Sequence, residues 1–279
     1  MKVALINPRG FCFGVHRALE MMDGIKNQNV YVLHEIVHNK NVIDGYIKKG
    51  FRFTESISDI PAGSHVVISA HGIGQNIEDE LKKNFVVSDT TCPFVKKIHY
   101  WVRQLAQKQI PIILIGKKNH AEVIGIKGQI ENYQNIFIVS NVDDIGLLPD
   151  FDSVGVATQT TLSLDDVREI VNRIKKKYKT VFFQNGVCQA TQERQEAVKN
   201  AAREYEMIVV VGDEKSSNAH RLVEVARTNG SDSILVETVS DLKKYTFPKS
   251  VAITAAASAP ESVVQEVYHY LINLNKNTG

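Results

Sequence analysis

Short β-branched runs alternate along the chain with longer segments in which apolar residues recur at helical spacing. This order favours an α/β fold with mainly parallel strands. The candidate strands are Val3–Ile6, Val30–Leu33, Val66–Ser69, Ile112–Ile115, Ile136–Val139, Val154–Ala157, Val181–Phe183, Ile208–Val211, Ile234–Val236 and Val251–Thr254. Candidate helices include Val15–Met22, Lys96–Gln107, Asp165–Lys177, Gln192–Tyr205, Ala219–Arg227 and Glu261–Leu274. The number of candidate strands is larger than one doubly wound sheet usually contains, so we expect several small sheets.

Composition and charge narrow the class of protein. The 279 residues are 43% hydrophobic and 23% charged, which is typical of a globular chain with a sizeable core. A length of 279 residues first suggests about two domains. The net charge is +2, and the sequence contains no long block of charges of one sign. We therefore expect no nucleic-acid partner. The apolar runs are too short for a membrane span or a signal peptide, so we expect a cytoplasmic protein with no membrane partner.

The chain contains three cysteines, Cys12, Cys92 and Cys188, which are too few for a disulfide framework. A lone cysteine is usually a small buried hydrophobe. Here each cysteine stands between a predicted strand and a predicted helix, where helix N–H groups favour a thiolate. Zinc normally requires a fourth Cys or His ligand. Three thiolates on a four-iron cluster would leave one iron free to bind substrate. The spacing alone leaves both metals possible.

Polar residues gather just after the strands, where ligands of parallel α/β sheets bind. The histidines at strand exits are His38, His71 and His120, although a lone histidine is more often a satisfied surface or core residue. The triplet Ser216, Ser217 and Asn218 opens a predicted helix, and Ser258 stands before Pro260 in a similar place. Such helix starts can bind an anion, although ordinary N-capping explains them equally well.

Two further side chains have chemistry that suits a proton transfer. We place Glu122 in the same loop as His120, where a carboxyl can serve as a proton donor, although most glutamates are simply solvated. Thr160 can bind a substrate hydroxyl or relay a proton, or it can belong to an ordinary turn before the Ser163/Asp166 capping box. The sequence has neither phosphate-loop nor dinucleotide motif, so an ATPase or a nicotinamide enzyme has little support.

The loops after the predicted strands contain nine ordered motifs. They are Gly10-Phe11-Cys12-Phe13-Gly14-Val15, Glu35-Ile36-Val37-His38-Asn39, Ser69-Ala70-His71-Gly72, Thr90-Thr91-Cys92-Pro93, His120-Ala121-Glu122-Val123, Thr158-Gln159-Thr160-Thr161, Cys188-Gln189-Ala190-Thr191, Ser216-Ser217-Asn218 and Thr254-Ala255-Ala256-Ala257-Ser258-Ala259-Pro260. Taken together, these motifs closely resemble the LytB-type 4-hydroxy-3-methylbut-2-enyl diphosphate reductases of the non-mevalonate isoprenoid route. The resemblance runs from Cys12 to Pro260.

The resemblance implies three similar small α/β domains with mainly parallel sheets, arranged as a trefoil around a central [4Fe-4S] cluster. The implied segments are 13–95, 96–190 and 191–272, the last joined by the N-terminal segment 1–12, with a tail at 273–279. The cysteines Cys12, Cys92 and Cys188 would hold the cluster, and the substrate hydroxyl would bind the iron that lacks a cysteine. Reduced ferredoxin or flavodoxin would supply two electrons.

The resemblance also implies roles for the other side chains. Glu122 would be the proton source and Thr160 the hydroxyl partner that helps to deliver the proton. The expected diphosphate ligands are His38, His71, His120, Ser216, Ser217, Asn218 and Ser258, with Thr160 also contacting the substrate. The products would be isopentenyl and dimethylallyl diphosphate.

This chain departs from the family pattern at three positions. In the segment Asn119-His120-Ala121-Glu122, the family often has Gly-His-Pro-Glu, so Asn119 and Ala121 are the departures. The third departure is Ala256, where glycine is common. These changes bear on loop stiffness more than on the chemistry. Two other functions stay open from the sequence: a different [4Fe-4S] dehydratase or reductase, and a zinc-binding regulatory or structural protein that uses three cysteines and a histidine.

Overall fold

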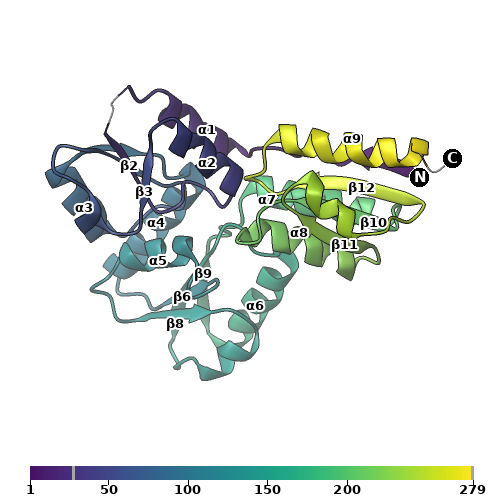
Figure 1. Cartoon of the computed structure of the whole chain (residues 1–279). Helices are drawn as coiled ribbons and strands as arrows, with labels where there is room; N and C mark the ends of the chain where they lie inside the picture. Colours follow the sequence, from purple (N-terminus) through teal and green to yellow (C-terminus); the bar gives the residue numbers. More distant parts are fainter. Residues whose placement is uncertain (27–28, 278–279) are drawn as a thin grey trace. The chain divides into compact units, whose positions relative to one another are not determined.

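A computed structural model describes residues 1–26 and 29–277 and shows an α/β fold with three four-stranded sheets (Figure 1). All strand pairs within these sheets are parallel. The first sheet has the order β1 (Lys2–Leu5), β12 (Ser250–Ala255), β10 (Met207–Val211) and β11 (Asp232–Val236). The second has the order β3 (Arg52–Thr54), β2 (Val30–Leu33), β4 (His65–Ile68) and β5 (Val86–Asp89). The third has the order β7 (Ile136–Val139), β6 (Ile112–Ile115), β8 (Ser153–Thr158) and β9 (Thr180–Phe183).

Helices connect the strands, as parallel pairing requires. They are α1 (Phe13–Asp23), α2 (Lys40–Lys48), α3 (Gln75–Asn84), α4 (Pro93–Gln107), α5 (Ala121–Gly128), α6 (Leu164–Lys177), α7 (Gln189–Ala201), α8 (Ser217–Thr228) and α9 (Glu261–Asn277). Three short 3-10 helices cover Ile57–Asp59, Val239–Lys244 and Asp143–Leu147. Helix α9 continues into the segment 273–279 that we expected as a tail, and residues 278–279 lie outside the described residues.

The structure confirms the ten predicted strands to within two residues at their ends. The sequence analysis did not find β3 and β5, which are the two edge strands of the second sheet. Strand β3 has three residues, and Val86 at the start of β5 is 62% exposed. Both therefore lack the continuous apolar run that marks a strand with two covered faces.

The described chain divides into two compact units. Unit 1 comprises Met1–His16, His38–Asp44 and the chain from Gln189, and it contains the first sheet. Unit 2 comprises Arg17–Val37 and Gly45–Cys188, and it contains the second and third sheets. Each sheet takes its strands from one of the three expected segments, with β1 supplied by residues 1–12. The boundaries of those segments stay a prediction.

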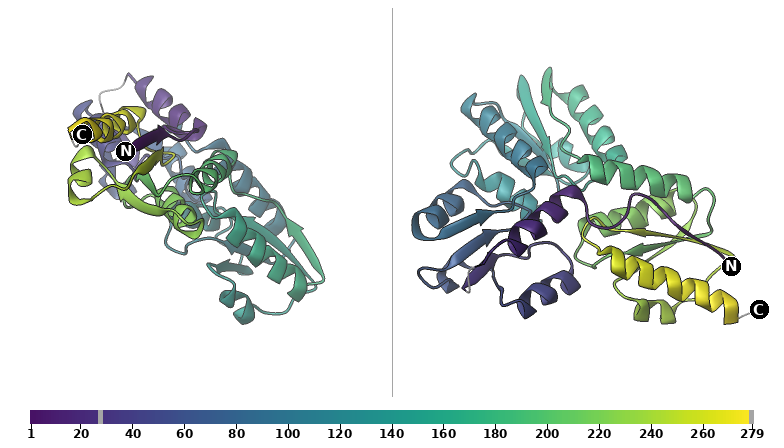
Figure 2. Two further views of the ribbon diagram at one scale, coloured as in Figure 1. Left: turned by 90° about the vertical axis from the view of Figure 1, so that its right-hand side faces the viewer. Right: turned by 90° about the horizontal axis from the view of Figure 1, so that it is seen from above.

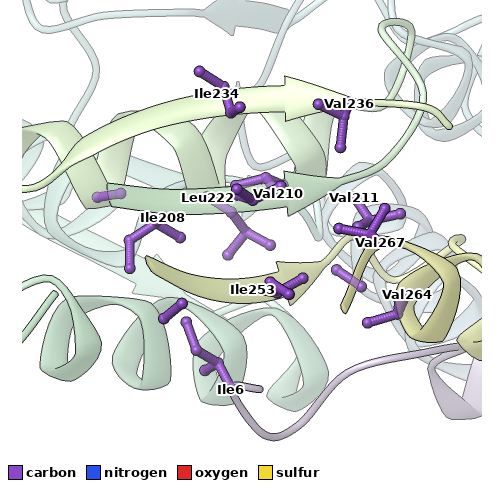
Figure 3. Close-up of a cluster of buried hydrophobic side chains, with 14 of the residues drawn as sticks. Ile6, Ile208, Val210, Val211, Leu222, Ile234, Val236, Ile253, Val264 and Val267 are labelled. Atoms are coloured by element: carbon purple, nitrogen blue, oxygen red, sulfur yellow. The ribbon is translucent and has the colours of Figure 1, made fainter. Parts of the chain in front are cut away.

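The core of unit 1 shows how the sheets hold the strand ends in place. Strand β10 is buried along its whole length, as expected of a central parallel strand covered on both faces. Leu222 from α8 and Val264 and Val267 from α9 pack with the strands in one apolar cluster (Figure 3). Helix α9 lies beside β1 and β12 (Figure 2). This packing fixes the carboxyl ends of the strands, from which the candidate site residues extend.

None of the described helices combines the length and apolar content that crossing a membrane requires.

Candidate active site

The three cysteines occupy equivalent places in the three sheets. Cys12 follows β1 and precedes α1, Cys92 follows β5 and precedes α4, and Cys188 follows β9 and precedes α7. Each of those strands is the edge strand of its sheet. All three thiols are unbridged and half-buried. The prediction that each cysteine lies at a loop-to-helix transition is therefore confirmed.

A backbone hydrogen bond fastens each cysteine to the loop that follows the neighbouring inner strand. The N–H groups of Cys12, Cys92 and Cys188 donate to the carbonyls of Ala257 at 3.0 Å, Ala70 at 3.0 Å and Thr160 at 3.1 Å, respectively. These acceptors follow β12, β4 and β8. The same loops carry Ser258, His71 and Thr160. In each sheet, the parallel register therefore connects a cysteine to the loop that carries a second candidate residue.

The second inner strand of each sheet supplies the remaining candidates. His38 follows β2, His120 follows β6, and the triplet from Ser216 follows β10. All candidate residues thus lie beyond the carboxyl ends of strands, where parallel sheets bind ligands. The sequence-based placement at strand exits is confirmed, except for Glu122.

Glu122 lies in the first turn of α5 and not in a loop with His120, so that placement was wrong. His120 is the N-cap of this helix, and its Nδ1 accepts a hydrogen bond from the backbone N–H of Glu122 at 3.2 Å. This helix was not among the predicted ones, because it has only 8 residues and includes Gly125 and Gly128, which weaken a helical pattern. Helical geometry turns the Glu122 side chain inward, and the residue is only 2% exposed.

Glu122 and Thr160 form a buried pair in unit 2. The Thr160 backbone N–H donates to Oε1 of Glu122 at 2.7 Å, and the Thr160 hydroxyl donates to Oε2 at 2.8 Å. Burial raises the pKa of Glu122 to about 7, and the two hydrogen bonds from Thr160 act in the opposite direction. A carboxyl with this pKa is partly protonated near neutral pH. It can therefore donate a proton to a bound substrate.

His71 and His120 face each other in unit 2. Their ring centroids are 5.9 Å apart, and the ring planes meet at 82°. Because Nδ1 of His120 accepts a hydrogen bond, the proton of the neutral ring lies on Nε2. That Nε2–H group is a donor of the kind that binds an anionic oxygen.

In unit 1, the loop that carries His38 is tied to the loops after β12 and β10. The Ser258 hydroxyl donates to the His38 carbonyl at 3.0 Å. The backbone N–H of Lys40 donates to Oδ2 of Asp213 at 3.1 Å. Ser258 therefore links the His38 segment to the loop after β12. These bonds bring His38, Ser258 and the loop before α8 together within one unit.

The Ser216–Asn218 triplet combines a cap with an unpartnered amide. The Ser216 hydroxyl accepts from the Ala219 N–H at 3.3 Å, so Ser216 is the N-cap of α8. The Asn218 side chain is buried, and neither its Oδ1 nor its Nδ2 has a hydrogen-bond partner. A buried amide without partners is costly, which suggests that it pairs with a bound ligand.

Two buried hydroxyls that the sequence analysis did not assign also lack partners. They are Ser69 Oγ after β4 and Thr254 Oγ1 in β12. Thr254 interrupts the apolar run from Val251 to Ala255, so the signal was visible in the sequence. Ser69 immediately precedes Ala70, whose carbonyl accepts the hydrogen bond from the Cys92 backbone N–H.

The departures from the family pattern are accommodated locally. Ala121 is the first residue of α5 after its N-cap, a position where proline is favoured but not required. Ala256 is fully buried, and a Cβ added to Gly212 would lie 2.9 Å from the Ala256 methyl group. Gly212 therefore leaves the space that the Ala256 methyl group occupies.

The donor chemistry of the cysteines fits a thiolate-bound metal group, since each is an unbridged thiol at a helix N-terminus. Cys92 and Cys188 belong to unit 2, and Cys12 belongs to unit 1. Among residues 1–26 and 29–277, no three His, Cys, Asp or Glu side chains are grouped to hold a metal ion. The cluster therefore stays a proposal.

Comparison with known proteins decides the family. The model of the LytB protein family matches residues 3–272, which is nearly the whole chain. The chain belongs to the LytB family. Curated LytB relatives include the 4-hydroxy-3-methylbut-2-enyl diphosphate reductase of Haemophilus influenzae (strain PittGG), which is 42% identical over 289 residues, covering 100% of this chain and 92% of the relative. The reductase of Actinobacillus pleuropneumoniae serotype 3 (strain JL03) is 40% identical, covering 98% and 91%.

Solved LytB structures confirm the three-sheet fold. The E-1-hydroxy-2-methyl-but-2-enyl-4-diphosphate reductase from Plasmodium falciparum matches with a TM-score of 0.91 and 37% identity, covering 98% of this chain and 87% of that chain. A second structure, of (E)-4-hydroxy-3-methyl-but-2-enyl diphosphate reductase, described as the terminal enzyme of the non-mevalonate pathway, has a TM-score of 0.70 and 32% identity, covering 98% and 100%.

Proposed function

We propose that this chain reductively removes the allylic hydroxyl of 4-hydroxy-3-methylbut-2-enyl diphosphate, the last step of the non-mevalonate isoprenoid route. Two electrons and two protons are consumed. The C–O bond breaks, a C–H bond forms, the oxygen leaves as water, and the products are isopentenyl and dimethylallyl diphosphate. The buried Glu122–Thr160 pair, in a chain that the LytB family model matches over residues 3–272, is the observation that carries this proposal.

We propose that Cys12, Cys92 and Cys188 hold a [4Fe-4S] cluster. Their equivalent places after the edge strands and their unbridged thiols support this assignment. When bound, such a cluster would supply the electrons and a Lewis-acidic iron for the C–O bond. The backbone bonds from the cysteines to Ala257, Ala70 and Thr160 keep each thiol-bearing loop beside a proposed substrate-binding loop.

We propose that the diphosphate is bound by His38, His71, His120, Ser216, Ser217, Asn218 and Ser258. In unit 2, the Nε2–H tautomer of His120 and its contact with His71 support this role. In unit 1, the unpartnered amide of Asn218 and the bond from Ser258 to His38 support it. Positioning by the diphosphate would make proton delivery effectively intramolecular.

Glu122 supplies the proton that the departing hydroxyl needs. The pKa of about 7 means that the carboxyl is protonated often enough to donate and becomes a stable carboxylate afterwards. The Thr160 hydroxyl stabilises that carboxylate, and its proposed second role is to contact the substrate hydroxyl. Burial keeps both groups away from water, so the proton goes to the substrate.

Electrons are proposed to come from reduced ferredoxin or flavodoxin, since the sequence has no flavin or nicotinamide motif of its own. The cytoplasm stays our expectation for the location of the protein.

The test is anaerobic reconstitution followed by iron and sulfide analysis, and incubation with the allylic diphosphate and a strong reductant. We expect cluster formation, lost in Cys→Ser variants at Cys12, Cys92 or Cys188, and formation of both five-carbon diphosphates. An intact cluster without product would instead point to another [4Fe-4S] dehydratase or reductase. Stoichiometric zinc without sulfide would overturn the cluster assignment.

A further inference from the structure

The loop after β4, which carries His71, is held between α4 and α5 in unit 2. On the α4 side, Gly72 has a positive φ of 73°, and a Cβ there would lie 2.7 Å from Cε1 of His99 and 2.9 Å from the Thr91 methyl group. The loop backbone therefore rests directly on these two side chains. A larger residue at position 72 would push the His71 turn away from α4.

On the other side, α5 approaches the same loop without intervening side chains. A Cβ added to Gly125 would lie 3.0 Å from the Gly72 carbonyl oxygen, and one added to Gly128 would lie 2.7 Å from the Gly74 Cα. At these glycines backbone meets backbone and no side chains interlock, so a directional contact is needed to set the register of α5 against the loop.

Gln129 supplies that directional contact. It is the C-cap of α5, is 5% exposed, and uses both ends of its amide. Its Nε2 donates to the Ile73 carbonyl at 2.6 Å, and its Oε1 accepts from the Arg103 guanidinium of α4. One buried amide thus joins α4, α5 and the loop, and Arg103 fixes which end of the amide faces Ile73.

We propose that Gln129 is a positioning residue for the His71–His120 pair. The opposite end of α5 begins at His120, and Ile73 lies two residues after His71. The Gln129–Ile73 bond therefore fixes both members of the pair relative to each other, although Gln129 touches neither ring. This inference rests on the proposed function, because it assigns the pair to diphosphate binding.

His99, the α4 side chain on which Gly72 rests, has a neutral ring near neutral pH. His99 lies against Gly72 and is 5% exposed. Burial, together with the charges of Arg103 and Lys96, lowers the pKa of His99 to about 4, while Asp89 acts in the opposite direction. The support under the loop therefore stays uncharged near neutral pH.

The test uses reconstituted full-length protein, with Gln129→Glu as the variant and Gln107→Glu as the matched control. Glu at 129 keeps an acceptor for Arg103 but loses the donor to Ile73, whereas Gln107 is an exposed residue near the end of α4. Binding of inorganic diphosphate is measured by calorimetry, and KM and kcat are measured with the allylic diphosphate.

We expect Q129E to weaken diphosphate binding and raise KM by about tenfold, with kcat changed by less than about threefold. Tenfold is about the value of one charge-assisted hydrogen bond between the displaced histidine pair and the diphosphate. Q107E should match the wild type in all three quantities. A merely structural role would instead lower kcat, cluster content and melting temperature together. Diphosphate binding by Q129E within about twofold of the wild type would overturn the proposal.

If Q129E does not fold, Arg103→Met replaces it, since this change removes the bond that orients the amide. It also removes a positive charge that lowers the pKa of His99, but burial, the larger cause, still keeps that pKa low. The same split between KM and kcat is expected, with a smaller change in KM, and unchanged diphosphate binding by the folded R103M protein would overturn the proposal. Failure of the proposed function has a different signature: the wild type itself would neither bind diphosphate nor form product.

Discussion

The backbone N–H and the hydroxyl of Thr160 hold the two carboxyl oxygens of Glu122 at 2.7 and 2.8 Å. Both residues are buried, so the carboxyl is shielded from solvent and its charge is stabilised by the two hydrogen bonds from Thr160. Burial raises the pKa of Glu122 to about 7 despite those bonds. The pair is therefore poised to change protonation state near neutral pH.

Glu122→Gln should keep the cluster and the binding of inorganic diphosphate but lose most turnover. The amide keeps the size of the side chain and cannot donate an acidic proton, so we expect kcat to fall by at least about a hundredfold. The measurements are iron and sulfide per chain, diphosphate affinity and product formation. Near-normal turnover would remove Glu122 from the proposed role.

The same variant should change how the stability of the metal-free protein depends on pH. Because the folded pKa of Glu122 lies above the unfolded value, its stabilising contribution is complete below pH 4.5 and is lost as the pH rises through about 7. The free energy of unfolding of the wild type, relative to E122Q, should therefore fall over this range by up to about 3 kcal/mol. Denaturant unfolding at several pH values measures it, and parallel curves would contradict the assignment.

Thr160→Val should move the pH dependence of turnover upward. The hydroxyl of Thr160 stabilises the carboxylate form, so its removal raises the pKa of Glu122 further and shifts the loss of activity to higher pH. We also expect kcat to fall by at least about tenfold, because proton delivery is impaired. Thr160→Ser retains the hydroxyl and should restore both the pH profile and most of kcat. A valine profile identical to that of the wild type would exclude this coupling.

The position of every cysteine before a helix could be predicted, because strand, loop and helix follow each other locally in the sequence. The hydrogen bond from Cys12 to Ala257 could not, because it depends on the pairing of β1 with β12, almost 250 residues away. No local pattern specifies which strands become neighbours. The same limit hid the relation of Cys92 to Ala70 and of Cys188 to Thr160.

The errors in the sequence analysis have local causes. Strands β3 and β5 lie at sheet edges and expose residues such as Arg52 and Val86, so their patterns lack an apolar run. Helix α5 is short and rich in glycine, which weakens its helical signal, and Glu122 was therefore assigned to a loop. The glycines at 125 and 128 are explained only by their close approach to the loop after β4.

Asn218→Leu should separate stability from binding. The Asn218 amide is buried without partners, so leucine removes an unsatisfied group while keeping the number and branching of the side-chain heavy atoms, and the ligand-free protein should gain about 1 kcal/mol of stability. Diphosphate affinity should fall by at least about tenfold. Ser233→Ala is the matched control: it removes a buried hydroxyl that donates to the Ile208 carbonyl, so it should lower stability and leave diphosphate affinity unchanged. Retained affinity in N218L would contradict the role of Asn218.

Gly186→Ala should impair cluster binding through the loop that carries Cys188. A Cβ at this position would lie 2.6 Å from both the carbonyl and the hydroxyl oxygens of Thr158, and the Gly186 N–H donates to that hydroxyl at 3.0 Å. Since a backbone carbonyl cannot move aside easily, the loop itself must shift and carry Cys188 with it. We expect substoichiometric iron and sulfide and a loss of about 1–3 kcal/mol in stability.

Gly146→Ala is the matched control for that experiment. No atom lies within 4 Å of a Cβ added at Gly146, so its stability should change by less than about 0.5 kcal/mol and its iron and sulfide content should equal that of the wild type. Full iron and sulfide in the G186A protein would show that the Cys188 loop tolerates displacement. The fastening of Cys188 to the neighbouring strand exit would then have no part in holding the cluster.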